Sequence, residues 1–497
     1  MPVVYCPTNQ QLILSWFKSL GYFGLLFSLS VLTLSVTARE TVTQSDNQSV
    51  CPQDLPLAIE KIITRPQLAR SRWGIAIQTQ NSKNLYSLEA DKYFIPASVV
   101  KLVTTAAALV ELGADFRIET PVYAVGNAPN LTSLRLEGRG DPTLSVKSLK
   151  AIVHRLQELG IKRIEKLIVD DSYFTQSSLN ATWEWSDVYS YYGTAVNSLI
   201  LDRNTVTLTL FPQAIGKPVK LEWSNAIAAR QWRVANNAIT APKDTEYNVT
   251  IDGVLGEPIL NINGELASNE TPDVWGLAIV NPANYFLESW RLILEKTGIK
   301  IIQGRVIEQA DNNNSETKIA TLISPQLSVI LSEINQDSHN LSAEVLLNLL
   351  QKKLKTDNKI DAVETTLTKL GINEKDYVLV DGSGLSRHNL LTPTVLVEIL
   401  NLMAADSQYS QVYQNSLAVA GKNGTLKNRF IDTQVSGNLW GKTGTLTGVS
   451  TLAGYLNVPN YQTLVFSIMV NNSDLSSSEI RKAIDEIILL LSQLKHC

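Results

Sequence analysis

The chain is poor in the residues that build metal sites. Its 497 residues include 3 cysteines and 4 histidines, and none of them cluster with the spacing of metal ligands, so a metal site is not expected. A strong excess of one charge is also missing. The formal net charge of −4 gives no global reason to bind nucleic acid or anionic lipid.

Long apolar runs are rare, but one stands near the N-terminus. Residues 19–38 carry no charge, follow Lys18 and end in small residues at Ala38. This pattern predicts export, with residues 1–38 as a signal peptide cleaved after Ala38 or as a retained membrane anchor. Residues 39–54 are polar and are expected to form a linker. The protein is therefore expected in the periplasm or elsewhere in the cell envelope.

The scarcity of cysteine leaves one candidate disulfide. Cys6 precedes the apolar run, whereas Cys51 and Cys497 stand near the two ends of the chain that would remain after cleavage. In an oxidising compartment these two either form a disulfide or remain unrelated thiols. A disulfide requires the two ends of the folded chain to meet.

The two ends of the chain carry similar mixtures of helix and strand patterns. Residues 54–66 have helical periodicity, residues 72–94 can form two strands, and a helix is expected over 97–112. Near the C-terminus, strand patterns over 437–472 precede an amphipathic helix over 476–495. These patterns predict an α+β fold in which both ends of the chain build one antiparallel sheet flanked by helices.

The centre of the chain has a different character. Residues 118–317 contain many short strand-like runs separated by Gly, Asn and Pro turns, with clear helices only at 148–160 and 285–298. Helices resume after residue 322. We therefore expect residues 118–317 to be a large, mostly β insertion, and residues 55–117 and 318–497 to form one domain around it.

Three short motifs carry the candidate chemistry, and each has competing matches. Ser-x-x-Lys occurs four times, Lys-Thr-Gly twice, and Ser-x-Asn at several positions that include Ser45/Asn47, Ser178/Asn180 and Ser338/Asn340. The matches set aside lie in the apolar N-terminal segment, in polar loops or at helix ends: Ser15/Lys18, Ser315/Lys318, Ser492/Lys495, Ser45/Asn47, Ser178/Asn180 and Lys296–Gly298. The matches that remain are Ser98/Lys101 at a helix start, Ser338/Asn340 between two helices, and Lys442–Thr445 on a strand.

This set predicts a nucleophilic serine enzyme. Ser98 and Lys101 lie one helical turn apart, so a neutral Lys101 can accept the proton of the Ser98 hydroxyl. A lysine is neutral near pH 7 only if burial or a neighbouring cation, here Lys442, lowers its pKa. Ser338 can relay the proton to the leaving amine. Asn340 can hold the substrate amide and orient Lys101.

The three motifs, in this order, resemble those of class C low-molecular-weight penicillin-binding proteins, the D-alanyl-D-alanine carboxypeptidase/endopeptidase family. Further segments fit the same family, namely GRGDPTL (138–144), VDDSYF (169–174), WEWSD (183–187), DGSGLSR (381–387) and GKNGTLKNRF (421–430). The resemblance covers the chain from about residue 55 to its end and implies a β-lactamase/transpeptidase-like catalytic domain with a large insertion. It implies a serine peptidase that needs no cofactor, acts on peptidoglycan stem peptides through an acyl-enzyme and is acylated by penicillin.

The resemblance also assigns substrate-binding residues. Lys442 and Thr443 would attract the terminal carboxylate of the substrate, and Gly444 would leave the strand edge open to an extended peptide. The backbone N–H groups of Ser98 and Thr445 would form the oxyanion hole.

Two softer assignments follow from position in the family pattern. Asp187 and Arg387 would line a pocket for the free polar end of a peptidoglycan side chain. Their alternative role is a surface salt bridge or loop anchor.

One residue departs from the family pattern. His339 occupies the middle of Ser-x-Asn, where Asp or Asn is common, and we expect it to be a solvent-facing loop residue instead of a proton-transfer group. The outer residues of the motif, Ser338 and Asn340, are intact.

Two other functions share these motifs. A serine β-lactamase would need a deacylating group, and Glu344/Asn348 fits the letters of one such element. However, this pair follows Asn340 immediately, so we interpret it as a chance match. A non-catalytic cell-wall-binding protein could keep the same fold, although the intact Ser98, Lys101 and Lys442 argue against it.

Overall fold

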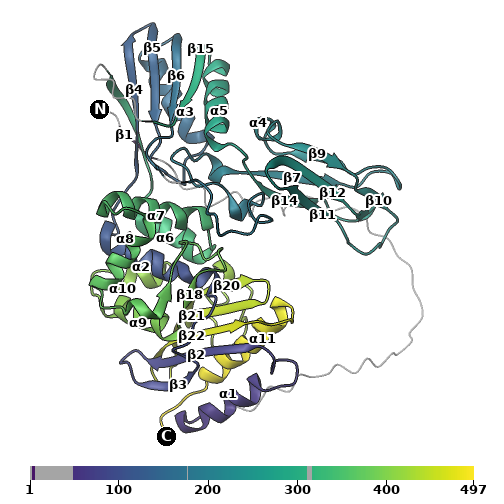
Figure 1. The fold of residues 1–497 in the computed structure, drawn as a ribbon, viewed down its shortest axis with the longest axis vertical. Helices are drawn as coiled ribbons and strands as arrows, with labels where there is room; N and C mark the ends of the chain where they lie inside the picture. Colours follow the sequence, from purple (N-terminus) through teal and green to yellow (C-terminus); the bar gives the residue numbers. More distant parts are fainter. Residues whose placement is uncertain (1–2, 6–48, 176, 310–315) are drawn as a thin grey trace, which may run out of the picture.

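The structure is a computed structural model that describes residues 3–5, 49–175, 177–309 and 316–497. The expected signal peptide or anchor at 19–38 lies outside the described residues. Within those ranges, no helix is both long and apolar enough to cross a membrane. Figure 1 shows an elongated molecule with one large sheet at each end of its long axis and a helical layer between them.

One six-stranded sheet is built from both ends of the chain, as the sequence predicts (lower part of Figure 1). Its strand order is β19-β20-β21-β22-β2-β3, and all neighbouring strands are antiparallel. The strands are β2 (Arg72–Thr79), β3 (Asn84–Leu88), β19 (Ala418–Val419), β20 (Leu439–Leu446), β21 (Val449–Asn457) and β22 (Thr463–Asn471). The pairing of β2 with β22 joins the two ends of the chain.

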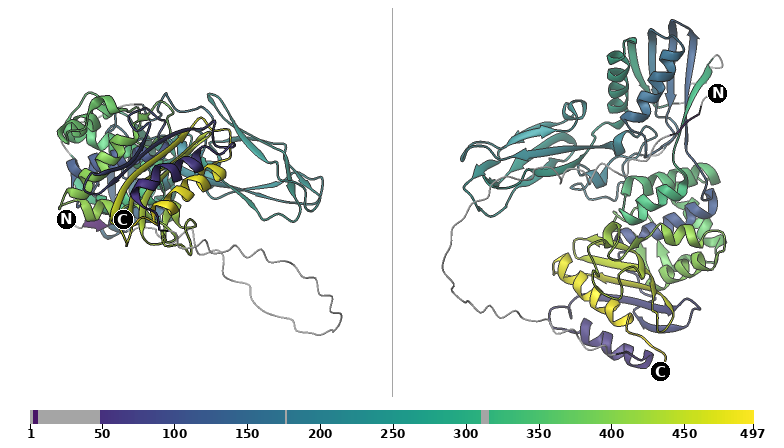
Figure 2. Two further views of the ribbon diagram at one scale, coloured as in Figure 1. Left: turned by 90° about the horizontal axis from the view of Figure 1, so that it is seen from below. Right: turned by 180° about the vertical axis from the view of Figure 1, so that it is seen from behind.

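Helices cover both faces of this sheet because alternate side chains on its central strands point to opposite sides. Leu452 and Phe466 pack into the core under α1 (Leu55–Ile63) and α11 (Ser477–Leu491), which lie side by side in Figure 2. Helix α11 begins at a capping box formed by Ser476 and Glu479.

The opposite face of the sheet packs against the main helical cluster. Ala453 and Val465 belong to this second core. The cluster consists of α2 (Val100–Leu112), α6 (Leu327–Gln336), α7 (Asn340–Leu354), α8 (Lys359–Lys369), α9 (Pro393–Ala405) and α10 (Ser410–Asn415). The expected helix over 97–112 is a 3₁₀ turn at Ala97–Val99 that runs directly into α2.

A second six-stranded sheet lies at the other end of the molecule (top of Figure 1). Its order is β1-β16-β4-β5-β6-β15, and α3 (Val146–Glu158) and α5 (Pro282–Lys296) share its core. The strands are β1 (Val3–Tyr5), β4 (Glu119–Asn127), β5 (Asn130–Glu137), β6 (Arg163–Asp170), β15 (Lys300–Ile307) and β16 (Thr317–Ile323). Because β16 pairs with β4, this sheet extends to Ile323.

Smaller sheets project from the side of this region (Figure 1). Their strand orders are β14-β7-β8, β11-β12-β9 and β10-β13. The elements are β7 (Thr205–Phe211), β8 (Lys220–Trp223), α4 (Ala226–Ala229), β9 (Arg233–Asn236), β10 (Ile239–Ala241), β11 (Thr250–Val254), β12 (Glu257–Asn263), β13 (Glu265–Ala267) and β14 (Asp273–Ala278). A two-stranded ribbon of β17 (Tyr377–Val378) and β18 (Leu390–Leu391) lies beside the helical cluster.

A disulfide links the segment before α1 to the residues that follow α11. Cys51 and Cys497 form a disulfide with an S–S distance of 1.98 Å. Next to it, the Val50 N–H donates to the Gln493 carbonyl at 3.0 Å. Of the two alternatives for these cysteines, the structure contains the disulfide and not two free thiols.

Candidate active site

Ser98 and Lys101 face each other at the start of α2. Lys101 Nζ lies 2.9 Å from Ser98 Oγ, while Ser98 is partly exposed and Lys101 is completely buried. Two further acceptors hold the lysine, since Nζ lies 2.7 Å from Asn340 Oδ1 and 2.5 Å from the Ser383 carbonyl oxygen. The lysine is thus fixed at three points, one of which is the hydroxyl of the candidate nucleophile.

The environment of Lys101 favours its neutral form. Burial lowers the pKa of Lys101 to about 7, although the carboxylates of Asp381 and Glu344 act in the opposite direction. A substantial fraction of this lysine is therefore a free amine near pH 7. Burial is the main cause, so the sequence expectation of a lowered lysine pKa has a clear physical basis.

Ser338 stands at the break between α6 and α7, on the other side of the nucleophile. Its backbone has a φ of +62°, which non-glycine residues rarely adopt. Its Oγ accepts a hydrogen bond from Lys442 Nζ at 2.9 Å, and the same nitrogen donates to the Thr443 carbonyl at 2.8 Å. Lys442 is completely buried, and burial together with the nearby Lys101 lowers its pKa well below the usual value.

Strand β20 brings the third motif close to Ser98 because Gly444 has no side chain. A Cβ on Gly444 would lie 2.2 Å from Thr451 Oγ1 and 2.9 Å from the Ser98 backbone nitrogen. The glycine is therefore required by close packing against the nucleophile. On the outer side of β20, the short strand β19 pairs only with Trp440 and Gly441.

The motifs open into a cavity of about 450 Å³. It is lined by Ser98, Glu184, Asp187, Tyr191, Tyr192, Asp337, Ser338, His339, Asn340, Leu341, Gly384, Leu385, Arg387, Thr425, Thr445, Leu446 and Thr447. The lining does not include four other residues of the motifs, namely Lys101, Lys442, Thr443 and Gly444. The structure therefore brings all ten residues that the sequence marked as catalytic or substrate-binding to one site, six of them at the cavity surface.

Comparison with known proteins agrees with this geometry. Residues 55–491 match the D-Ala-D-Ala carboxypeptidase 3 (S13) family. The chain belongs to this family.

Curated relatives cover most of the S13 chain. A D-alanyl-D-alanine carboxypeptidase of Actinomadura sp. (strain R39) is 32% identical over 437 residues, which cover 83% of this chain and 80% of the relative. Penicillin-sensitive carboxypeptidase A of Dictyostelium discoideum is 29% identical over 525 residues, covering 96% and 99% of the two chains. The enzyme class expected from the sequence, a serine-type D-Ala-D-Ala carboxypeptidase, is confirmed.

A solved structure has the same fold. Penicillin binding protein 4 (dacB) from Haemophilus influenzae superposes with a TM-score of 0.77 at 24% identity, covering 90% of this chain and 100% of that chain. The α+β fold class with antiparallel sheets flanked by helices is thereby confirmed.

One wall of the S13 site comes from the segment that includes residues 180–193. Asn180 Nδ2 donates to the Val380 carbonyl at 2.7 Å, and Thr182 Oγ1 donates to Ser386 Oγ at 2.7 Å. The indole N–H of Trp183 donates to Asp381 Oδ2 at 2.9 Å. We call residues 180–193 the wall segment. Its contacts with the 380–387 loop fix it against the catalytic motifs.

Asp187 and Arg387 both line the cavity, and each has a partner that sequence reasoning missed. Arg387 Nε donates to Glu184 Oε1 at 2.8 Å, and Arg387 also bonds the Thr447 carbonyl. The Tyr192 hydroxyl lies 3.3 Å from Asp187 Oδ1. Burial and the neighbouring Glu184 raise the pKa of Asp187, while Tyr192 and Arg387 act against this shift. The WEWSD segment marked this region, but its first acid carried no separate signal.

The solvent-facing loop position expected for His339 is only partly what the structure shows. The residue is partly buried and caps α7, because its Nδ1 accepts from the Ser342 N–H at 3.3 Å and lies 2.8 Å from Ser342 Oγ. Burial and the cations of Arg203 and Lys101 lower the pKa of His339 to about 3. The imidazole is therefore neutral near pH 7 and serves the helix start.

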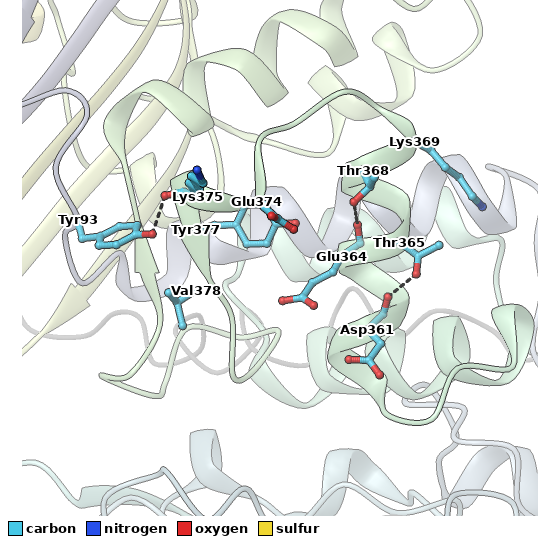
Figure 3. A pocket seen from close by; sticks show the side chains of 10 residues that line it. All are labelled: Tyr93, Asp361, Glu364, Thr365, Thr368, Lys369, Glu374, Lys375, Tyr377 and Val378. Atoms are coloured by element: carbon cyan, nitrogen blue, oxygen red, sulfur yellow. Dashed lines mark hydrogen bonds between the residues drawn. The ribbon is translucent and has the colours of Figure 1, made fainter.

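A larger cavity of about 820 Å³ lies elsewhere on the helical cluster. Figure 3 shows Tyr93 and Lys375 on one side of it and the α8 residues Asp361 and Glu364 on the other. None of the predicted site residues lines this cavity. The smaller cavity is therefore the candidate active site, because it alone of the two contains the nucleophile.

Proposed function

We propose that this S13 chain is a D-Ala-D-Ala carboxypeptidase/endopeptidase that cleaves peptidoglycan stem peptides through an acyl-enzyme on Ser98, and that β-lactams acylate the same serine. The observation that carries this proposal is the 2.9 Å contact between Ser98 Oγ and a buried Lys101 whose pKa is about 7. The names of the two curated relatives described above support the same substrate and inhibitor class.

Acylation begins with transfer of the Ser98 proton to neutral Lys101 as Oγ attacks the substrate carbonyl. Negative charge then develops on the carbonyl oxygen, where the backbone N–H groups of Ser98 and Thr445 stabilise it. Gly444 supports this role, because it lets β20 approach Ser98 closely enough for both donors to reach one oxygen.

The leaving amine requires a proton when the peptide bond breaks. Ser338 Oγ is the proposed relay, which passes to the amine the proton that Lys101 took from Ser98. Lys442 Nζ donates to this oxygen at 2.9 Å and so stabilises negative charge on it. Lys101, neutral again once its proton has passed through Ser338 to the amine, removes a proton from the water that attacks the acyl-enzyme carbonyl. It delivers that proton to Ser98 Oγ as the ester bond breaks and free enzyme is regenerated.

Substrate recognition is proposed to use both sides of the cavity. On the β20 side, Thr443 and Thr445 receive the terminal carboxylate, with the buried side chain of Lys442 behind them. On the wall-segment side, Asp187 and Arg387 receive the free polar end of the peptidoglycan side chain. Both residues line the same cavity as Ser98, which supports this assignment.

We also propose a division into a catalytic domain and an insertion, with the catalytic domain formed by residues 55–117 and the C-terminal part of the chain. The pairing of β16 with β4 favours a second boundary just after Ile323. Export to the cell envelope is proposed as well. The uncharged segment 19–38 and the disulfide between Cys51 and Cys497 support it, since disulfides persist in oxidising compartments.

The test uses the full chain and two substrates. Fluorescent penicillin should label the protein at Ser98, identified by peptide mass spectrometry, and a stem peptide ending in D-Ala-D-Ala should release D-alanine. Ser98→Ala should lose both signals while keeping its circular dichroism spectrum. A folded wild-type protein that neither binds penicillin covalently nor releases D-alanine would overturn the proposal. Rapid turnover of penicillin would instead favour the β-lactamase alternative.

A further inference from the structure

Glu344 is a fully buried carboxylate one helical turn beyond Asn340 on α7. Its exposed fraction is 0%. Its Oε1 accepts two backbone hydrogen bonds, from the Gly382 N–H at 2.8 Å and from the Ser383 N–H at 2.9 Å. Burying a carboxylate is costly unless it is well compensated, so this arrangement calls for an explanation beyond helix packing.

Glu344 holds the residue that contacts the catalytic lysine, although the N–H and the carbonyl of that residue, Ser383, belong to successive peptide groups. Ser383 donates its N–H to Glu344, while its carbonyl oxygen lies 2.5 Å from Lys101 Nζ. The neighbouring Gly382 carbonyl accepts from Thr104 Oγ1 on α2 at 2.9 Å. The 382–383 turn is therefore clamped between α7 and α2, with Glu344 on one side and Lys101 on the other.

The geometry around Lys101 explains why that carbonyl matters. A neutral amine has two N–H donors and one lone pair. If Asn340 Oδ1 and the Ser383 carbonyl take the two N–H groups, the lone pair is left facing Ser98 Oγ. In that state the Ser98 hydroxyl donates to the lysine, which is the arrangement required to remove its proton. Loss of either acceptor frees the amine to rotate away from this orientation.

We propose that Glu344 is a positioning residue for the reaction: it fixes the Ser383 carbonyl against Lys101 Nζ and so directs the lysine lone pair at Ser98. The inference rests on the proposed acyl-enzyme chemistry at Ser98. It assigns Glu344 a role different from the deacylating group of a β-lactamase, because Glu344 does not line the cavity and its Oε1 is occupied by the 382–383 turn. Asn348, the other half of that chance match, donates to the Glu344 backbone carbonyl.

The charged groups around Lys101 and Glu344 make the pKa of Lys101 a second measurable quantity that depends on Glu344. Lys101 is faced by Asp381 and Glu344, which raise its pKa, and by Lys442 beyond Ser338. Glu344 is faced by Asp381 and by Lys359, whose Nζ lies 3.6 Å from Oε2. Burial and the nearby Asp381 raise the pKa of Glu344, while Lys359 acts against this shift. Over the pH range in which Glu344 is ionised, removing its charge alone should therefore lower the pKa of Lys101, with its hydrogen-bond acceptors unchanged.

The test compares Glu344→Gln with Glu344→Leu in the full chain, using the rate of Ser98 acylation by penicillin G as a function of pH. Glutamine keeps an oxygen that can accept both N–H groups but carries no charge. Its rate should stay near that of the wild type at the plateau, and the acidic limb of its profile should move to lower pH. Leucine removes the acceptor, so its rate should fall by about tenfold or more at every pH.

Two controls separate positioning from general damage to the fold. Thr366→Val removes a fully buried hydroxyl from α8, where it bonds Glu111 and Ala362 but not the 382–383 turn. Its acylation rate should be within about twofold of the wild type even if the unfolding temperature falls. Thermal unfolding of every variant establishes that it is folded at the assay temperature.

Three results would overturn the inference: wild-type acylation by folded Glu344→Leu, an acidic limb of Glu344→Gln that does not move, or an equal loss in Thr366→Val. If Glu344→Leu fails to fold, the pH profile of Ser98 acylation in Glu344→Gln is the measurement that tests the inference. Failure of the proposed function gives a different pattern, because the wild-type chain itself would then not be acylated at Ser98.

Discussion

The side-chain amide of Asn340 joins the catalytic lysine to the wall segment. Its Nδ2 donates to the Tyr192 carbonyl oxygen at 2.9 Å, while its Oδ1 lies 2.7 Å from Lys101 Nζ. The Tyr192 contact fixes which end of the amide faces the lysine, because only the NH₂ end can donate to a carbonyl. A main-chain atom of the wall segment therefore determines the orientation of a group in the catalytic centre.

Replacing Asn340 by Asp should change the pH dependence of acylation. The carboxylate cannot donate to the Tyr192 carbonyl, and its charge close to Lys101 raises the pKa of the lysine. If the pKa rises by about one unit, the neutral fraction at low pH falls about tenfold. Acylation by penicillin should then be slow at pH 7 and recover above pH 8. In Asn340→Ala, which adds no charge, the rate should fall at all pH values; a profile of Asn340→Asp that overlays the wild type contradicts this account.

The wild-type enzyme should gain activity as pH rises through the titration of Lys101. Burial lowers the pKa of this lysine to about 7, and only the neutral amine accepts the Ser98 proton. The acylation rate should therefore be low at pH 5, half-maximal near pH 7 and constant above pH 8. Stopped-flow acylation with a chromogenic β-lactam measures this profile.

Lys101→Arg tests whether Lys101 acts as a base or only as a positive charge. Lys101→Arg keeps a cation near Asn340 but stays protonated in proteins, so its acylation rate should fall by about 10²–10⁴, the usual contribution of a general base. The acylation rate of Lys101→Ala should fall by the same factor. Substantial activity in Lys101→Arg would mean that another group removes the proton.

The sequence predicted the side chains of this site better than its backbone groups. Ser98, Lys101, Ser338, Asn340 and Lys442 could be found because their spacing and their places on a helix start, a helix break and a strand are visible in the chain. The carbonyls of Ser383 and Tyr192 leave no such trace, since every residue has a carbonyl. Their roles depend on loops whose course is set by tertiary contacts.

The partners of Glu344 and His339 could not be predicted from the sequence, because they too depend on tertiary contacts. Glu344 matched a motif by letters, and its real partners are the N–H groups of a loop that lies 38 and 39 positions further along the chain. His339 was expected to be a solvent-facing loop residue, yet it is partly buried and caps the next helix. For the fold, the sheet shared by both chain ends was predicted from alternating patterns, whereas the pairing of β16 with β4 required the structure.

Gly444→Ala should disable the site by displacing β20 from Ser98. The added methyl group would overlap Thr451 Oγ1 at 2.2 Å and crowd the Ser98 nitrogen at 2.9 Å. Overpacking of this kind costs about 1–3 kcal/mol, and the shift also spoils the oxyanion donors. Gly441→Ala on the same strand is the matched control, because its nearest contacts would be 3.2 Å away. The control should retain most of its acylation rate in the penicillin assay; equal losses would argue against a specific role for Gly444.

Removing the disulfide should lower stability without changing acylation. The Cys51–Cys497 bond closes a loop of 446 residues and lies by α1 and α11, on the sheet face opposite the helical cluster that carries the site. Loss of such a bond costs about 2–5 kcal/mol. Urea unfolding of the Cys51→Ser/Cys497→Ser variant should show this decrease, whereas the rate of penicillin acylation of the folded protein should remain that of the wild type. A slower acylation rate would place the chain ends in contact with the catalytic machinery.

Asp187→Asn should affect peptide substrates more than penicillin. Asp187 lines the cavity beside Tyr192, and its proposed partner is the charged end of a peptide side chain, which penicillin G lacks. Hydrogen bonds to charged groups are worth about 1.5–3 kcal/mol, so kcat/KM for a stem peptide with a free amino end should fall at least about tenfold. The same peptide with that amine acetylated is the matched substrate control, and its kcat/KM should respond little to the substitution. Glu184→Gln is the matched protein control, since it removes the partner of Arg387 and leaves Asp187 in place. Equal effects of Asp187→Asn on both peptides would show that the residue anchors the wall segment instead of binding the substrate.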